Sequence, residues 1–103
     1  MNTDESKRII PRPFELHWGS GHIVEEATYA GQHHEPSIQL LEFEDGSPEV
    51  RFCYYDHAGP FDYAQGRRFQ RSLLIVSDDE ITGLSKALAK TPRLRSLLRR
   101  MVG

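Results

Sequence analysis

Arginine and aromatic residues alternate in two stretches of this 103-residue chain, VRFCYY at 50–55 and RRFQR at 67–71. Guanidinium groups neutralise phosphates, while tyrosine and phenylalanine rings offer a face on which an unpaired base can stack. If the two stretches are neighbouring strands of one sheet, they bring both kinds of group to a common surface. The candidate nucleic-acid-binding residues are therefore Arg51, Tyr55, Arg68, Phe69 and Arg71.

The same pattern has a purely structural interpretation, in which the tyrosines fill the core and the arginines solvate an edge strand. Alternation places Arg51 and Tyr55 on one face of their strand. In the second stretch Phe69 and Arg71 share one face, and Arg68 lies on the other. The sequence leaves open which face of this strand points outward.

The net charge of −2 hides an asymmetry between the two parts of the chain. Residues 1–63 carry four Lys/Arg against twelve Asp/Glu, and residues 64–103 carry nine Lys/Arg against three Asp/Glu, so their charges are −8 and +6. A basic half can bind nucleic acid even in a slightly acidic chain, because counterion release depends on the local patch. Alternatively, the two halves are electrostatically complementary and pack against each other.

Five histidines and one cysteine are the residues that a metal or catalytic site would use. The spacing of the histidines matches no zinc pattern, so we interpret them as solvated side chains. Cys53 and His57 are four residues apart, but a thiol in mid-strand beside aromatic residues normally behaves as a small hydrophobe with an unlowered pKa. No Walker or dinucleotide-binding glycine pattern is present. The sequence predicts no enzyme, no metal site and no cofactor.

The length and composition indicate one small domain. A single cysteine excludes an internal disulfide bond. No apolar run approaches the roughly 18 residues of a membrane span, and the polar start lacks the apolar stretch of a signal peptide. We expect a flexible N-terminal arm over residues 1–13, a single domain over residues 14–103, no membrane association and a cytoplasmic location.

Alternating apolar residues predict an antiparallel sheet in the first three quarters of the chain. Phe14, Leu16 and Trp18 fall on one face of the first strand, and the GSG sequence at 19–21 reads as the turn that follows it. Asp45-Gly46 supplies the tight turn of a second hairpin. The predicted strands are 14–18, 22–29, 37–44, 49–55 and 68–76.

Two helices are predicted after the last strand. Ser77 and Glu80 form an S-x-x-E capping box, which marks the start of a helix over residues 78–90. Thr91 as cap and Pro92 at the first helical position begin a second helix, over residues 92–102. The predicted apolar faces of the two helices consist of Ile81, Leu84, Ala87, Leu88, Leu94, Leu97, Leu98 and Met101.

In this order of features, residues 37–90 resemble the positive-cofactor-four-like transcriptional coactivators and their small bacterial relatives. The strand with Val50-Arg51 and its trailing tyrosines is similar to the Ile-Arg strand of that family. LLIVSDDEITGLSKAL at 73–88 is similar to its last strand running directly into its helix. The family has Lys-Gly before that last strand, where this chain has Ser72-Leu73. The resemblance implies a curved antiparallel sheet with a helix, a homodimer, and binding of single-stranded DNA.

The sequence therefore predicts an α+β domain: a curved antiparallel sheet of four to five strands, followed by one bent or two consecutive C-terminal helices. Two functions of different classes remain. The first is binding of single-stranded nucleic acid, expected to be DNA, on a sheet surface, with a transcription-associated role and a homodimer. The second is a non-enzymatic protein-interaction or assembly module that does not bind nucleic acid.

Overall fold

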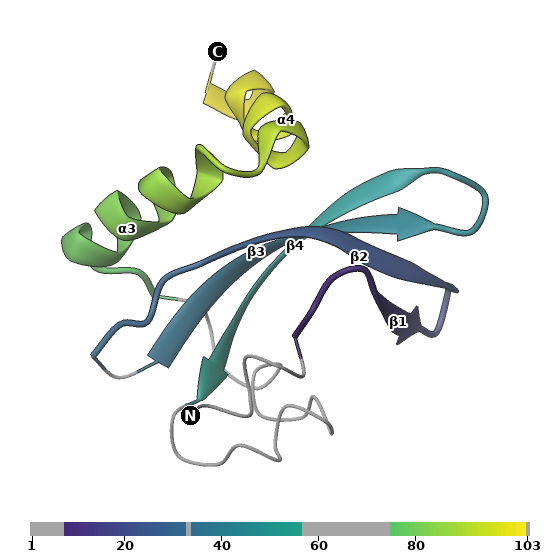
Figure 1. The fold of residues 1–103 in the computed structure, drawn as a ribbon, viewed down its shortest axis with the longest axis horizontal. Helices are drawn as coiled ribbons and strands as arrows, with labels where there is room; N and C mark the ends of the chain where they lie inside the picture. The colour runs from purple at the N-terminus through teal and green to yellow at the C-terminus, as the bar shows by residue number, and fades with distance from the viewer. Residues whose placement is uncertain (1–7, 33, 57–74, 103) are drawn as a thin grey trace.

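The computed structural model describes residues 8–32, 34–56 and 75–102, which form a four-stranded antiparallel sheet followed by two helices (Figure 1). The strand order β1-β2-β3-β4 follows the chain, as in a meander. The strands are Arg12–Leu16, Gly19–Thr28, His34–Phe43 and Pro48–Asp56, and the helices, numbered as in Figure 1, are α3, Asp78–Leu88, and α4, Pro92–Val102. The predicted α+β class, with two consecutive C-terminal helices, is confirmed.

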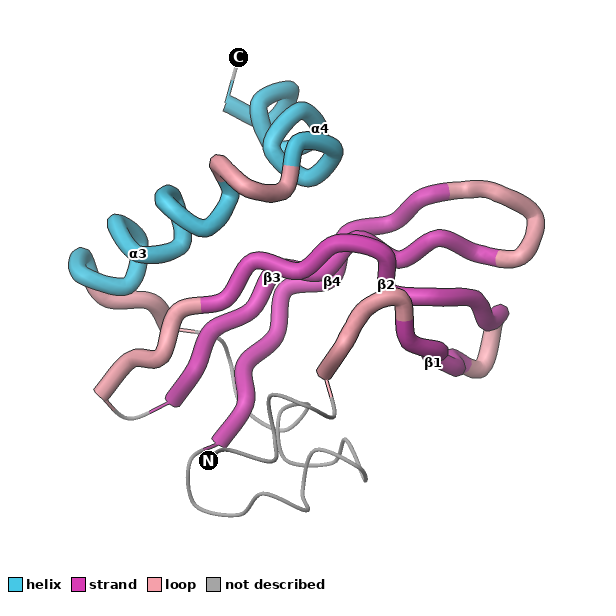
Figure 2. The backbone as a smooth tube through the Cα atoms, in the orientation of Figure 1, coloured by secondary structure: helices cyan, strands magenta, loops and turns pink. Residues whose placement is uncertain are grey.

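Both helices cover the same face of the sheet (Figure 2). A β-bulge in β2 between Ile23 and Glu25 shifts the register there, and Val24 consequently packs toward the helices. The core on this face consists of Ala27, Ile38, Leu40, Leu84 and Leu94. A second apolar cluster, on the strands near β1, consists of Phe14, Ile23, Leu41 and Phe43.

The first hairpin is placed differently from the prediction. His17 and Trp18 form its turn, Leu16 pairs with Gly19, and the GSG sequence lies inside β2. A Cβ atom at Gly21 would overlap the backbone carbonyl of Glu42 on the next strand, so glycine is needed here for a close strand approach rather than for a turn. The predicted turn at 19–21 is wrong, and Trp18 is exposed at the hairpin tip instead of sharing the buried face of Phe14.

The sheet is strongly curved, so β1 lies beneath the face that the helices leave uncovered (Figure 1). Although β1 and β4 are at opposite ends of the strand order, Arg12 on β1 donates to the hydroxyl of Tyr55 on β4 across 3.1 Å. The boundary that the sequence predicts between an N-terminal arm, 1–13, and the domain, 14–103, falls inside β1, which begins at Arg12. Arg8, further back in the expected arm, forms an ion pair with Glu35 at 2.9 Å.

The predicted capping box at the start of α3 is confirmed: Ser77 Oγ accepts from the N–H of Glu80, and the Glu80 carboxylate accepts from the N–H of Ser77. Leu84 is buried against the sheet, but Ile81, predicted for the same apolar face, is exposed. The predicted fifth strand, 68–76, lies outside the described residues except for Ile75 and Val76, which belong to an irregular segment before α3.

The first turn of α4 is capped from the sheet. The Glu25 carboxylate accepts from the N–H groups of Arg93, at 3.3 Å, and Leu94, at 2.8 Å. Thr91, predicted as the side-chain cap, instead donates its hydroxyl to the carbonyl of Leu88 at the end of α3. Leu94 is fully buried, whereas Met101, the last residue of the predicted stripe, is exposed.

Candidate nucleic-acid interface

A buried polar network occupies the helix-free face of the sheet. Glu26 accepts hydrogen bonds from Ser37 at 2.7 Å, Gln39 at 2.8 Å and Tyr55 at 3.2 Å, and it forms an ion pair with Arg12 at 2.8 Å. Burial alone would raise the pKa of Glu26, but the hydrogen bonds from Gln39 and Ser37 and the charge of Arg12 outweigh it and hold the pKa below its usual value.

Arg8 adds a second ion pair to this network. It donates to both carboxylate oxygens of Glu35, at 2.9 and 3.1 Å, and its guanidinium carbon lies 4.4 Å from the centre of the Tyr55 ring. Burial acts to lower the pKa of Arg8, but the hydrogen bond and charge of Glu35 raise it above its ordinary value. The ring of Tyr55 is therefore already covered by a cation.

Arg51 and Tyr55 share one strand face, as the alternation predicts, and both belong to the network. Arg51 donates from Nε to Gln39 Oε1 at 2.7 Å, and Tyr55 accepts from Gln39 at 2.8 Å. Tyr55 is only 6 % exposed. Its predicted role as a stacking platform is therefore corrected: the curvature of the sheet buries this ring, which cannot offer a face to a base. Arg68, Phe69 and Arg71 lie outside the described residues.

Cys53 lies on the same face and is buried, as expected for a mid-strand thiol. Burial raises the pKa of its thiol to about 11. His57, four residues further on, lies outside the described residues. A thiol with so high a pKa is almost entirely protonated at neutral pH and is a poor nucleophile.

The strongest positive charge in the described part of the chain lies on the helices. Between Ile81 and Val102 the sequence has six cations and no acidic residue. All six are exposed, and within the described residues only Arg93 forms an ion pair, with Glu42 at 3.3 Å. We call this set the basic helical surface; it consists of Lys86, Lys90, Arg93, Arg95, Arg99 and Arg100.

Two partly exposed aromatic rings flank α3. Phe52 on β4 is 48 % exposed and lines an apolar groove of about 370 Å³ together with Ile81, Leu84 and Leu88. Tyr29 lies on the other flank, so close to Gly83 that a Cβ atom there would overlap its ring. Phe52 follows Arg51 directly, so the alternation that assigns Tyr55 to one face assigns Phe52 to the other. The exposed ring of β4 is therefore that of Phe52, whereas the ring of Tyr55 is buried.

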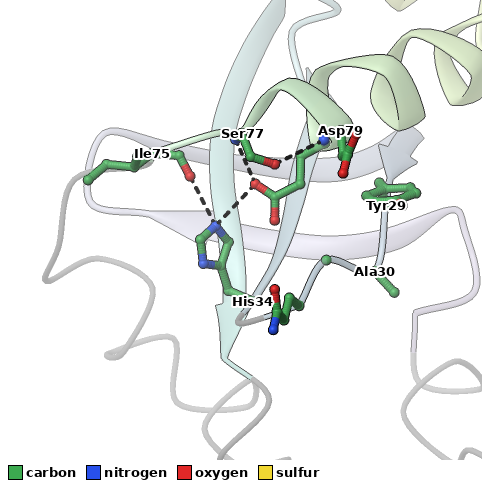
Figure 3. Close-up of a pocket in the computed structure, with 9 residues that line it drawn as sticks. Tyr29, Ala30, His34, Ile75, Ser77 and Asp79 are labelled. Carbon is green, nitrogen blue, oxygen red and sulfur yellow. Dashed lines mark hydrogen bonds and ion pairs between the residues drawn. The ribbon is translucent and has the colours of Figure 1, made fainter.

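A pocket of about 470 Å³ lies at the start of α3 (Figure 3). His34 projects into it, with Nε2 3.1 Å from the carbonyl oxygen of Ile75 and 3.9 Å from Glu80 Oε1. The ring of His34 also lies against Tyr54, with ring centres 4.9 Å apart. His34 thus ties β3 to the capping box of α3, rather than being solvated as predicted.

Neither a metal site nor a membrane span is found in the described residues. No three or more His, Cys, Asp or Glu side chains there are arranged to hold a metal ion. Of the helices in the described ranges, none is long and apolar enough to cross a bilayer.

Comparisons of the chain with protein-family models, with curated proteins and with solved structures find no match. The resemblance to the positive-cofactor-four-like family therefore stays a prediction from the sequence.

Proposed function

We propose that this protein binds single-stranded nucleic acid, with phosphates on the basic helical surface and bases against the aromatic rings that flank α3. The observation that carries the proposal is the exposure of six cations over residues 81–102, a range without acidic residues. Such a surface binds a polyanion because its cations replace the counterions of the phosphates, whatever the net charge of the whole chain.

The rings beside α3 are the reason for proposing a single strand. Phe52 and Tyr29 are each partly exposed, and they lie on opposite flanks of the helix. Stacking on an aromatic ring contributes about 1–3 kcal/mol per base, and it requires bases that are not already stacked in a duplex. DNA is the expected ligand, and an RNA strand of the same sequence tests that preference.

Fluorescence anisotropy with a labelled 20-nucleotide single strand, recorded over a salt series, tests the proposal. We expect micromolar or tighter binding at low salt, with a logarithmic salt slope of about 0.7 per phosphate contacted. A duplex of the same sequence should bind more weakly, because its bases are not available to the rings. No binding at low salt would refute the proposal and favour the protein-interaction module.

Paired substitutions locate the phosphate contacts. Arg95→Ser with Arg99→Ser removes two cations one helical turn apart and should lower the salt slope by about 1.4. Arg68→Ser with Arg71→Ser is the matched variant for the strand predicted from the sequence. If only this second pair lowers the slope, the helical placement is wrong although the function stands.

Two further features that the family resemblance implies belong to the same proposal: a homodimer and a transcription-associated role. Light scattering coupled to size exclusion measures the molar mass of the protein. A mass of one chain across the micromolar range would remove the homodimer from the proposal and leave the helical surface unaffected.

A further inference from the structure

The two hairpin turns at one end of the sheet border a small, open notch that the nucleic-acid proposal does not use. Its volume is about 250 Å³, and we call it the hairpin notch. One wall comes from the β1–β2 turn and the other from the β3–β4 turn. The residues that line it are Trp18, Gly19, Ser20, Phe43, Glu44 and Asp45.

Trp18, the only tryptophan of the chain, forms the aromatic wall of the notch. It is 60 % exposed, an unusual position for the largest apolar side chain. His17 contacts it edge to face, with ring centres 4.7 Å apart and planes at 86°. The neighbouring ring therefore helps to fix its orientation, while more than half of the residue's surface remains exposed.

The opposite wall is acidic and held in place by hydrogen bonds. The N–H of Glu44 donates to the carbonyl of Ser20 at 3.1 Å, which joins the two turns. Asp45 Oδ1 accepts from the N–H of Ser47 at 2.9 Å and from its hydroxyl at 2.7 Å. These hydrogen bonds from Ser47 lower the pKa of Asp45, which keeps it ionised. The notch is thus largely formed before any ligand binds.

We propose that the hairpin notch binds an arginine side chain of a basic partner segment. A cation over the face of a tryptophan is attracted by the ring quadrupole, and carboxylates beside the ring add charge complementarity. A guanidinium fits both walls at once, because its plane stacks on the indole while its edge donates to the carboxylates. A lysine ammonium is a strongly hydrated point charge and cannot stack.

The notch and the basic helical surface select ligands of opposite charge. Glu44 and Asp45 repel a phosphate backbone, so a nucleic acid on the helices leaves the notch open to a basic protein segment. The inference does not depend on nucleic-acid binding, and its test uses a different ligand and a different reporter.

The single indole N–H provides that reporter in a two-dimensional ¹H–¹⁵N NMR spectrum. The probes are three extended Gly/Ser peptides of the same sequence, which carry one arginine, one lysine or one citrulline at the same position. We expect the arginine peptide to shift the indole peak of Trp18 saturably at millimolar concentration. The lysine peptide should bind several-fold more weakly, and the uncharged citrulline peptide should not saturate.

Matched charge changes on the protein complete the experiment. Glu44→Gln removes a carboxylate from a residue that lines the notch and should weaken the binding of the arginine peptide several-fold. Glu49→Gln removes the same charge from an exposed position on β4 outside the lining and should leave binding unchanged. The proposal is overturned if the arginine peptide causes no shift, if citrulline binds as well as arginine, or if both variants weaken binding equally.

Discussion

Replacing Glu26 with glutamine should destabilise the fold by about 3 kcal/mol, because it leaves a buried guanidinium without its counter-charge. The Glu26 carboxylate pairs with Arg12 and accepts hydrogen bonds from Ser37, Gln39 and Tyr55, all within 3.2 Å. Removing one partner of a buried ion pair costs about 3–5 kcal/mol. The glutamine side chain keeps one acceptor oxygen for Ser37 and Gln39 but turns its NH₂ group toward Arg12. We therefore expect a loss of stability at the low end of this range.

Urea unfolding followed by far-ultraviolet circular dichroism measures this loss. A domain of this size unfolds with a slope of about 1–3 kcal/mol per molar urea, so the midpoint should fall by about 1–3 M. Glu49→Gln changes an exposed acid and should alter the stability by less than about 0.5 kcal/mol. Adding Arg12→Met to Glu26→Gln should recover part of the loss, because the uncompensated charge is then gone.

The pH dependence gives the same reasoning a second test. The folded-state pKa of Glu26 is below its unfolded value, so its contribution is complete above the unfolded pKa of about 4.3 and is lost as the pH falls through the folded pKa. The stability difference between the wild type and Glu26→Gln should therefore shrink on acidification below about pH 4. A loss under 1 kcal/mol at pH 7, or no recovery in the double variant, would refute the account of the network.

Three further predictions concern the cap of α4, the first hairpin and the thiol. Glu25→Ala should lower the stability by about 1 kcal/mol through loss of the α4 cap, and Glu25→Gln by less; equal thermal shifts would contradict a capping role. Gly21→Ala should cost about 1–3 kcal/mol because its Cβ meets backbone, whereas Gly19→Ala meets only the Phe43 ring at 3.0 Å and should cost less, which chemical denaturation can compare. Cys53, with its pKa raised to about 11, should react with a thiol reagent at pH 8 at least about a hundredfold faster after unfolding in urea; similar rates would show that it is not buried.

Features whose causes are local were predictable from the sequence. The capping box of α3 involves residues three apart, and Thr91-Pro92 correctly marks the start of α4. Period-2 alternation correctly placed Arg51 and Tyr55 on one face. In these cases every residue that determines the structure lies within a few positions of the others.

Two features that were predicted wrongly, the turn of the first hairpin and the cap of α4, involve contacts between residues far apart in the sequence. Gly21 lies against the backbone of Glu42 inside the sheet, a contact that strand alternation does not reveal, because alternation fits either position of the turn equally well. The cap of α4 comes from Glu25, 68 residues before Arg93. No local pattern marks either contact, because the partner is specified only once the sheet has formed.

Sheet curvature also explains why the ring of Tyr55 is not exposed. Alternation tells which side chains share a face, but the side chains of Arg8 and Arg12, which reach Tyr55 from the N-terminal segment and β1, decide that this ring is buried in a polar network.

The electrostatic complementarity expected between the two halves holds for part of the molecule. Complementarity between the halves is real at the first turn of α4, where Glu25 caps the helix and Glu42 pairs with Arg93. Other acids of the first half are used within the sheet, by Arg8 and Arg12. The other cations of the helices form no ion pair with an acid of the described residues; they are Lys86, Lys90, Arg95, Arg99 and Arg100. This surface stays basic after the internal pairs have formed, so a polyanion that bound there would displace only salt ions and water.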